Sequence, residues 1–320
     1  MSKNVAVILF NQGYPDSLEA VKPFLFNVFY DPAFLTVSNP MRWMMARSIS
    51  KQCAPKARDI YRELADNSSI HGETEKQKVK LEAYLNKLSN DNFKCFAFMR
   101  YWTPLAKDIL DDLKNYSPEE IIMLPLYPQY SITTTGSGLI EWNKKLAKTN
   151  FNIPFRVIKD YPESDFFIDT MADMINEKLK KIDQNKYRLL LCAQAIPKKT
   201  IEAGDPYQTQ VKRTVSALLK KIENENLDAV ICYQRRPGPL EQIGPTTEDQ
   251  IEKAAADNKN IIIIPISYVS ECSETLVELD IQYKEVAAKA GIKDYIRIKT
   301  VRDSEKFIAG MSNLVMENRV

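Results

Sequence analysis

Short apolar runs alternate along the chain with longer segments in which apolar residues recur at spacings of three and four. The runs are continuous, which is typical of strands buried on both faces of a parallel sheet. We expect strands at residues 5–10, 93–99, 121–126, 155–158, 188–193, 229–233, 261–269 and 295–298. We expect helices at residues 17–29, 54–64, 73–88, 163–180, 207–222, 247–256 and 304–316, and one that ends near residue 114.

Strand and helix alternate throughout, so the sequence predicts an α/β protein with two Rossmann-like, doubly wound domains facing a cleft. The chain has 320 residues, which is enough for two domains. We place the first domain at residues 1–150, the second at 151–300, and a last helix within 301–320. The strands followed by unusual residues end at Leu126, Ala193, Tyr233 and Val269.

The stretch from residue 261 to 283, IIIIPISYVSECSETLVELDIQY, combines a buried strand with a polar ladder. Ser270 is a suitable N-cap for a helix that follows the strand directly. Acidic and amide side chains then recur at spacings of three and four, at Glu271, Glu274, Glu278 and Gln282. They indicate either a ligand site at the carboxyl end of a strand or first-turn acids on a solvated helix face.

Residues 127–138, YPQYSITTTGSG, follow another predicted strand. Two tyrosines and a hydroxyl-rich turn are suited to hold a flat, partly anionic ligand. The same residues equally suit a Ser/Thr helix cap with packing tyrosines, so both interpretations stay open.

Residues 24–45 are rich in Phe, Tyr, Trp and Met and are interrupted by Pro32 and Pro40. The segment fits a mobile apolar lip over a pocket, a peripheral membrane contact, or an irregular packing segment.

Composition narrows the class of protein. The chain is 44% hydrophobic with a net charge of +2 and lacks a basic cluster, which argues against nucleic acid as a partner. No apolar run approaches the roughly 20 residues of a transmembrane helix, and the first residues are typical of a strand rather than a signal peptide. The five cysteines stand singly, as expected for reduced thiols of a cytoplasmic protein. The single histidine, His71, fits a surface or capping position.

Several motifs together resemble the ferrochelatase family, the class II chelatases that insert Fe(II) into a porphyrin in the last step of haem biosynthesis. They appear in family order over nearly the whole chain. The matching segments are the turn at residues 11–17, RYW at 100–102, LPLYPQYS at 124–131, TTTGS at 133–137, GDPY at 204–207, CYQ at 232–234 and ETLVELDI at 274–281.

The resemblance implies a chelatase fold with a porphyrin cleft, and a last helix that packs back on the first domain. It implies porphyrin and ferrous iron as substrates, no permanently bound cofactor, and no iron–sulfur cluster. The porphyrin-binding positions it implies are Tyr14, Tyr61, Ser68, Arg100, Tyr101, Tyr127 and Ser131. The implied catalytic positions are Glu274 and Gln194, and the implied metal-side residues are Glu274, Cys272 and Glu278.

The departures from the family pattern fall at positions that carry chemistry. Gln194 occupies the position of the catalytic histidine, Cys272 that of a second histidine, and Gln282 that of a glutamate. An imidazole can take a pyrrole proton, whereas a glutamine amide stays neutral. The sequence therefore predicts either a slowed ferrochelatase with Glu274 as the remaining base, or an inactive protein on the same fold that binds porphyrin, haem or a partner.

Overall fold

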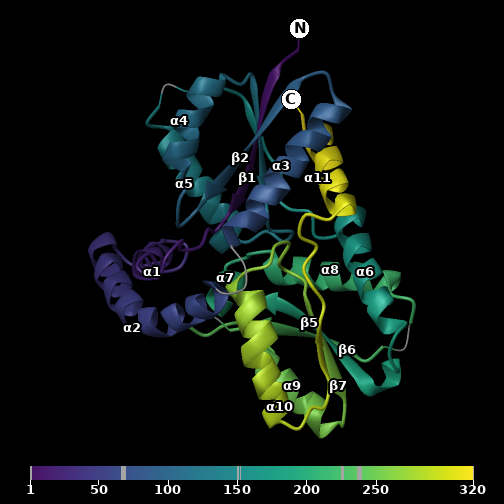
Figure 1. Ribbon diagram of the computed structural model, residues 1–320. Helices are drawn as coiled ribbons and strands as arrows, with labels where there is room; N and C mark the ends of the chain where they lie inside the picture. The colour runs from purple at the N-terminus through teal and green to yellow at the C-terminus, as the bar shows by residue number, and fades with distance from the viewer. Residues whose placement is uncertain are drawn as a thin grey trace. The chain divides into compact units, whose positions relative to one another are not determined.

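The structure is a computed structural model that describes residues 2–65, 70–149, 151, 153–224, 227–235 and 240–319. The chain divides into two compact units (Figure 1). The first unit is Met1–Asp160 with Asp303–Val320, and the second unit is Tyr161–Arg302. Each contains a four-stranded parallel sheet, which confirms the predicted α/β class.

The first sheet has the strand order β2-β1-β3-β4. Its strands are β1 (Asn4–Asn11), β2 (Asn92–Met99), β3 (Glu120–Pro125) and β4 (Phe155–Val157). All six residues of β3 and seven of the eight residues of β1 are buried, as the continuous apolar runs require when layers cover both faces of a sheet. The four strands coincide with predicted ones within a few residues.

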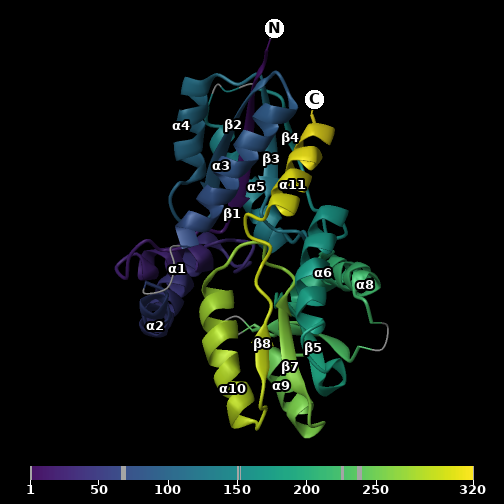
Figure 2. The ribbon, with the colours of Figure 1, turned by 45° about the vertical axis from the view of Figure 1, so that its right-hand side comes forward.

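The helices of the first unit are α1 (Val21–Phe29), α2 (Asn39–Ala65), α3 (Ile70–Leu88), α4 (Ala106–Tyr116), α5 (Ser137–Leu146) and α11 (Glu305–Glu317), with a π-helical turn η1 at Ile132–Gly136. Of these, α3, α4 and α5 lie against the sheet, whereas α1 and α2 pack on each other beyond the carboxyl ends of its strands (Figure 2). One core joins Phe10 and Phe98 of the sheet to α4 and to Trp142 of α5. On the sheet's edge α3 packs against β2, and α11 packs against α3.

The aromatic segment 24–45 belongs to two helices and the turn that joins them. Phe29, Leu35 and Ala46 form a small core, and the neighbouring apolar side chains of α1 and α2 pack around it. Met41, Trp43 and Met44 remain exposed at 53%, 45% and 66%. Pro40 lies in the first turn of α2, where the missing N–H of proline has no helical partner to lose. Most of the segment is therefore helical, so the prediction of an irregular packing segment does not describe its structure.

The second sheet has the order β6-β5-β7-β8, which repeats the order of the first when strands are counted along each unit. Its strands are β5 (Tyr187–Gln194), β6 (Ala229–Gln234), β7 (Asn260–Pro265) and β8 (Tyr295–Arg297). The helical elements of this unit are α6 (Asp165–Leu179), η2 (Gln184–Lys186), α7 (Lys198–Glu202), α8 (Tyr207–Lys221), α9 (Thr247–Ala256), η3 (Glu274–Gln282) and α10 (Tyr283–Lys289).

The stretch after the isoleucine run differs from the prediction. The strand β7 ends at Pro265, so residues 266–269 are not part of it. The helix begins at Glu274 and its N-cap is Ser273, so the predicted N-cap at Ser270 is wrong. The helix is also π-helical, with hydrogen bonds from residue i to i+5. A connecting segment, 266–273, therefore separates the sheet from the helix, and Glu271 of the predicted ladder lies in this segment.

Candidate functional site

Both sheets share a feature that places candidate sites at their strand ends. The chain of the second unit moves from β5 to β6 on one side and later to β7 on the other, and β1 of the first unit is flanked by β2 and β3 in the same way. Open parallel sheets bind ligands outside the carboxyl ends of the strands at such switch points. The carboxyl edge of each sheet is therefore a candidate site.

Two glutamines end neighbouring strands at the edge of the second sheet. Gln194 is the last residue of β5 and is the register partner of Gln234, the last residue of β6. Both are buried, with 7% and 2% of their surface exposed. The Gln194 backbone N–H donates to the Ser267 hydroxyl across 3.0 Å, which joins β5 to the segment that follows β7. Gln194 thus lies at the switch point.

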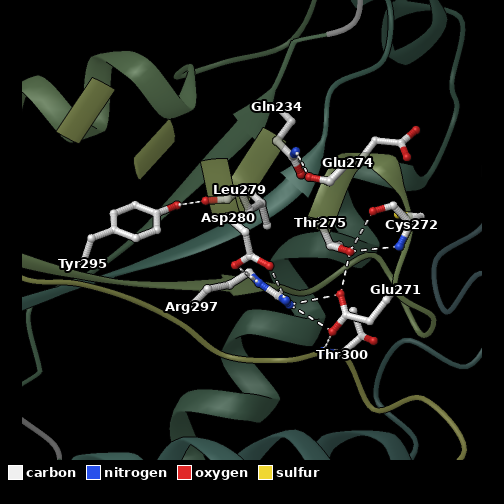
Figure 3. Close-up of polar contacts among 10 residues, drawn as sticks. All are labelled: Gln234, Glu271, Cys272, Glu274, Thr275, Leu279, Asp280, Tyr295, Arg297 and Thr300. Atoms are coloured by element: carbon white, nitrogen blue, oxygen red, sulfur yellow. Dashed lines mark hydrogen bonds and ion pairs between the residues drawn. The ribbon is translucent and has the colours of Figure 1, made fainter. Parts of the chain in front are cut away.

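The Gln234 side chain connects the sheet with η3. Its amide nitrogen donates to the backbone oxygen of Glu274 across 3.0 Å (Figure 3). The same nitrogen donates to the Glu278 carboxylate, also across 3.0 Å. Sequence reasoning included Gln234 in a matching motif but assigned it no role. Its position at a strand end was the signal that could have identified it.

The predicted ladder of acids is divided between two environments. Glu274 points away from Arg297 and Glu271 in Figure 3, and its carboxylate accepts a hydrogen bond of 2.8 Å from the Ser273 hydroxyl. Glu278 lies on the side of Gln234. Glu271 precedes the helix and is buried in an ion cluster. The π-helix and the connecting segment break the common stripe that an α-helix would give these residues.

The ion cluster is centred on Arg297, a residue that the sequence analysis did not identify. Its Nη1 lies 2.9 Å from Glu271 Oε1 and 3.0 Å from Oε2. Its Nε and Nη2 donate to the two oxygens of Asp280, across 2.5 and 2.7 Å. Burial lowers the pKa of the guanidinium, but Asp280 and Glu271 outweigh this effect and leave its pKa above the usual value. Arg297 is therefore cationic at any pH at which the protein is folded.

Cys272 is 1% exposed and lies in the segment before η3. Its backbone N–H donates to the Thr275 hydroxyl across 2.9 Å. Among the residues described, no three His, Cys, Asp or Glu side chains are grouped as a metal site would require. The structure thus does not bring Cys272, Glu274 and Glu278 together as a set of three ligands.

Two further thiols lie on β5 and β6, two residues before the carboxyl ends of these strands. Cys192 and Cys232 are register partners on β5 and β6, and both are fully buried. They pack in one core with Leu279 of η3 and Tyr283 of α10. Burial, together with the neighbouring Cys232, raises the pKa of the Cys192 thiol well above its usual value. Cys192 therefore acts as a core residue and not as a nucleophile, and Cys232 packs in the same core.

At the edge of the first sheet, one buried carboxylate gathers four donors. Asp31 is 3% exposed and accepts from Arg100 Nη2 at 2.9 Å. It also accepts from the Tyr101 hydroxyl at 2.8 Å, from the Ser137 hydroxyl, and from the Ala33 backbone N–H at 2.8 Å. Sequence reasoning missed Asp31. The only local signal was a single acid in an otherwise apolar segment.

This network fixes the two residues that follow β2. Arg100 Nε donates to Ser137 across 2.7 Å, yet the Arg100 side chain keeps 15% of its surface exposed. Tyr101 is 3% exposed and its backbone oxygen accepts from Asn27 of α1 across 2.9 Å. Burial, and then the Asp31 charge, raise the pKa of the Tyr101 phenol. Arg100 is thus the accessible member of the pair, and its guanidinium lies over the Tyr101 ring, 4.8 Å from the ring centroid.

The other predicted porphyrin-side residues have different surroundings. Tyr14 is 8% exposed and stacks on Phe24, with ring centroids 6.4 Å apart. Ser131 is fully buried and caps η1, where its hydroxyl accepts from the Thr133 N–H across 3.1 Å. Tyr127 follows β3 and Tyr61 lies on α2, and both are half-buried. Ser68 and the side chain of His71 fall outside the described residues.

Solved structures with the same fold define the general class. The chain matches SirB of Bacillus subtilis with Fe³⁺ at a TM-score of 0.57 and 10% identity, over 99% of this chain and 95% of that chain. It also matches DR2241 of Deinococcus radiodurans, which has structural similarity to chelatases, at a TM-score of 0.54, 9% identity, and coverage of 100% and 56%. At these identities the likeness concerns the fold, which is that of the class II chelatases.

The ferrochelatase family model matches residues 4–319. The ferrochelatase of Pelagibacter ubique is 44% identical over 98% of this chain and 90% of its own length. The ferrochelatase of Rickettsia felis is 45% identical, with coverage of 99% and 91%. The chain therefore belongs to the ferrochelatase family. None of the helices within the described residues is long and apolar enough to cross a membrane.

Proposed function

We propose that this protein is a ferrochelatase that inserts Fe(II) into protoporphyrin, and that the reaction is slowed by the absence of an imidazole at position 194. Family membership over residues 4–319 is the observation that carries the proposal. The two sheet edges support it with complementary chemistry. The first edge offers a partly exposed arginine to porphyrin carboxylates, and the second offers carboxylates to a cation and to protons.

Insertion requires two pyrrole N–H protons to leave as the metal arrives. Gln194 is buried at the switch point, but its amide neither accepts a proton nor binds Fe(II) usefully. We assign the role of base to Glu274, with Glu278 held nearby through Gln234. A positioned general base typically contributes a factor of about 10² to 10⁴, so we expect a turnover that is reduced by a factor within that range.

The test is anaerobic insertion of Fe(II) or Zn(II) into protoporphyrin, followed by absorbance. We expect turnover above the uncatalysed rate, loss of that turnover in Glu274→Gln, and a gain in Gln194→His combined with Cys272→His. Glu163→Gln is a matched control because Glu163 is an acid in an ion pair on the surface of the same unit. Turnover that is absent from the parent chain and from the double variant would contradict the proposal.

A second function is favoured by the neutral residue at position 194. A chain of this family without an effective base is suited to bind a porphyrin or haem without converting it. Tight binding of protoporphyrin, measured by fluorescence quenching, with no metallated product in the parent chain and with product in the double histidine variant, would support this alternative. Binding accompanied by turnover in the parent chain would exclude it.

A further inference from the structure

Glu274 and Glu278, at the carboxyl edge of the second sheet, lie on an unusual helix. The element η3 keeps π-helical hydrogen bonding over nine residues, Glu274–Gln282. Such bonding is rare, occurs mostly as single turns within α-helices, and is frequent at functional sites. Something outside the helix must therefore favour this register over the ordinary α-helical one.

Arg297, the last residue of β8, binds one acid that precedes η3 and one acid within it. Its guanidinium binds Glu271, three residues before η3, and Asp280, near the end of η3 (Figure 3). Only 7% of the Arg297 and Glu271 side chains is exposed, so water contributes little to either charge. A planar fork that faces two carboxylates at once fixes their relative position. An α-helical register would rotate Asp280 relative to Glu271 and break one of the two pairs.

The contacts extend from Glu271 to the backbone before η3. Thr275 donates to Glu271 Oε2 across 2.6 Å, and the Thr300 N–H donates to Oε1 across 3.1 Å. Thr275 in turn accepts from the Cys272 N–H. The position of the Arg297 guanidinium is thereby transmitted, through Glu271 and Thr275, to the residues that immediately precede Glu274.

We propose that Arg297 is a positioning residue for the metal side of the site. By binding Glu271 and Asp280 together, it holds η3 in the register that presents Glu274 and Glu278 to an incoming cation. The same pairing neutralises the other two acids of the segment, Glu271 and Asp280. This inference rests on the proposed insertion of a divalent metal into a porphyrin.

The test compares Arg297→Lys with Arg213→Lys. Lysine keeps the positive charge but cannot present a planar fork to two carboxylates. Arg213 pairs with Glu163 on the surface of the same unit, so it receives the same chemical change without touching η3. We expect Arg297→Lys to raise the KM for Zn²⁺ about 10-fold or more and to leave the KM for protoporphyrin within about twofold, because misplacing a reacting group is costly even at about 1 Å. Arg213→Lys changes neither value.

The KM values distinguish positioning from simple loss of folded protein. A smaller folded fraction lowers the total rate and leaves both KM values unchanged, and that result would overturn the inference. So would an equal rise in both values.

Hydrogen exchange provides a readout that needs no turnover. We expect amides in 271–283 to exchange about 10-fold faster in Arg297→Lys than in the parent chain, because the clamp on η3 is loosened. If the parent chain inserts no metal, the proposed function fails, and exchange alone decides the role of Arg297. Unchanged protection of 271–283 would then reject the clamp.

Discussion

Each unit has an arginine bound to aspartate or glutamate at the carboxyl edge of its sheet, but the group at the centre of the cluster differs. In the first unit one carboxylate, Asp31, binds four donors, and Arg100 remains 15% exposed. In the second unit one guanidinium, Arg297, binds two carboxylates and is 7% exposed. The first arrangement leaves a cation available to an anionic ligand. The second encloses its cation between Glu271 and Asp280, on the segment that carries Glu274 and Glu278.

The comparison shows how one strand order serves two kinds of chemistry. The order of strands is the same in both sheets, so the topology alone does not decide which charge is presented. The difference lies in the central group and its exposure: Arg100 is the cationic partner of Asp31 and stays 15% exposed, whereas Arg297 faces two carboxylates and is 7% exposed. If the clusters differ in this way, changes at Arg297, Asp31 and Tyr101 should have effects of different size.

The largest effect is expected for Arg297→Met. The change leaves the buried Glu271 without its cation, and breaking a buried ion pair typically costs about 3 to 5 kcal/mol. The loss at Asp280, whose side chain is 36% exposed, is screened by water and adds little. Urea unfolding measures the loss, and adding Glu271→Gln and Asp280→Asn is expected to recover part of it. Arg213→Met, at an exposed pair, serves as the control. A loss no larger than that of the control would show that Arg297 is not the centre of the cluster.

A smaller effect is expected for Asp31→Asn. Arg100, Tyr101 and Ser137 lose a charged acceptor, but water can reach the partly exposed Arg100. We expect a loss of about 2 to 3 kcal/mol in the free energy of unfolding. Asp111→Asn, at an exposed pair in the same unit, is expected to cause no measurable change. A cost for Asp31→Asn equal to that of Arg297→Met would remove the distinction between the clusters.

The smallest effect is expected for Tyr101→Phe, and it depends on pH. At pH 7 the variant loses the hydrogen bond to Asp31, worth about 1 kcal/mol. The pKa of Tyr101 is raised above the ordinary tyrosine value of 10.0, first by burial and then by Asp31. A raised pKa in the folded chain means that the contribution is complete below 10.0 and declines as the pH increases beyond it. The stability of the parent chain should therefore fall more steeply above that pH than that of the variant.

Unfolding free energies at neutral and alkaline pH provide the measurement. Other buried tyrosines contribute to the alkaline slope of both proteins, so only the difference between parent and variant is informative. Parallel slopes would mean that the pKa of Tyr101 is not raised in the folded chain. The Arg297 cluster is expected to show no such alkaline transition, since arginine remains charged.

The sequence predicted most of the fold because the signals for strands and many helices are local. The apolar runs located the eight described strands within a few residues. The predicted first and last residues of α9 (Thr247–Ala256) agree with the observed ones. The capping box of Thr246 and Asp249 explains why that boundary is sharp. The register of η3 was not predictable in this way, because spacings of three and four were interpreted with the geometry of an α-helix.

The site was predicted less completely because its supports come from distant parts of the chain. Asp31 is 69 residues from Arg100 and 106 residues from Ser137. Arg297 is 26 residues from Glu271 and 17 from Asp280. The family motifs identified residues at strand ends, such as Arg100 and Gln194. They do not indicate which buried charged side chain binds a given residue, as Asp31 binds Arg100. Only the packed chain brings these pairs together.

The place of α11 in the first unit has a consequence for how the protein is made. Its helix packs on α3, Arg319 pairs with Asp91 at 2.7 Å and Glu120 at 3.3 Å, and Lys80 binds Asp303 at 2.7 Å. Residues 161–302 leave the ribosome before these partners do. The second unit can thus complete its fold during translation, whereas the face of α3 that α11 covers stays uncovered until residues 305–317 emerge. A chaperone that shields this face during synthesis would act on the unit that begins first and finishes last.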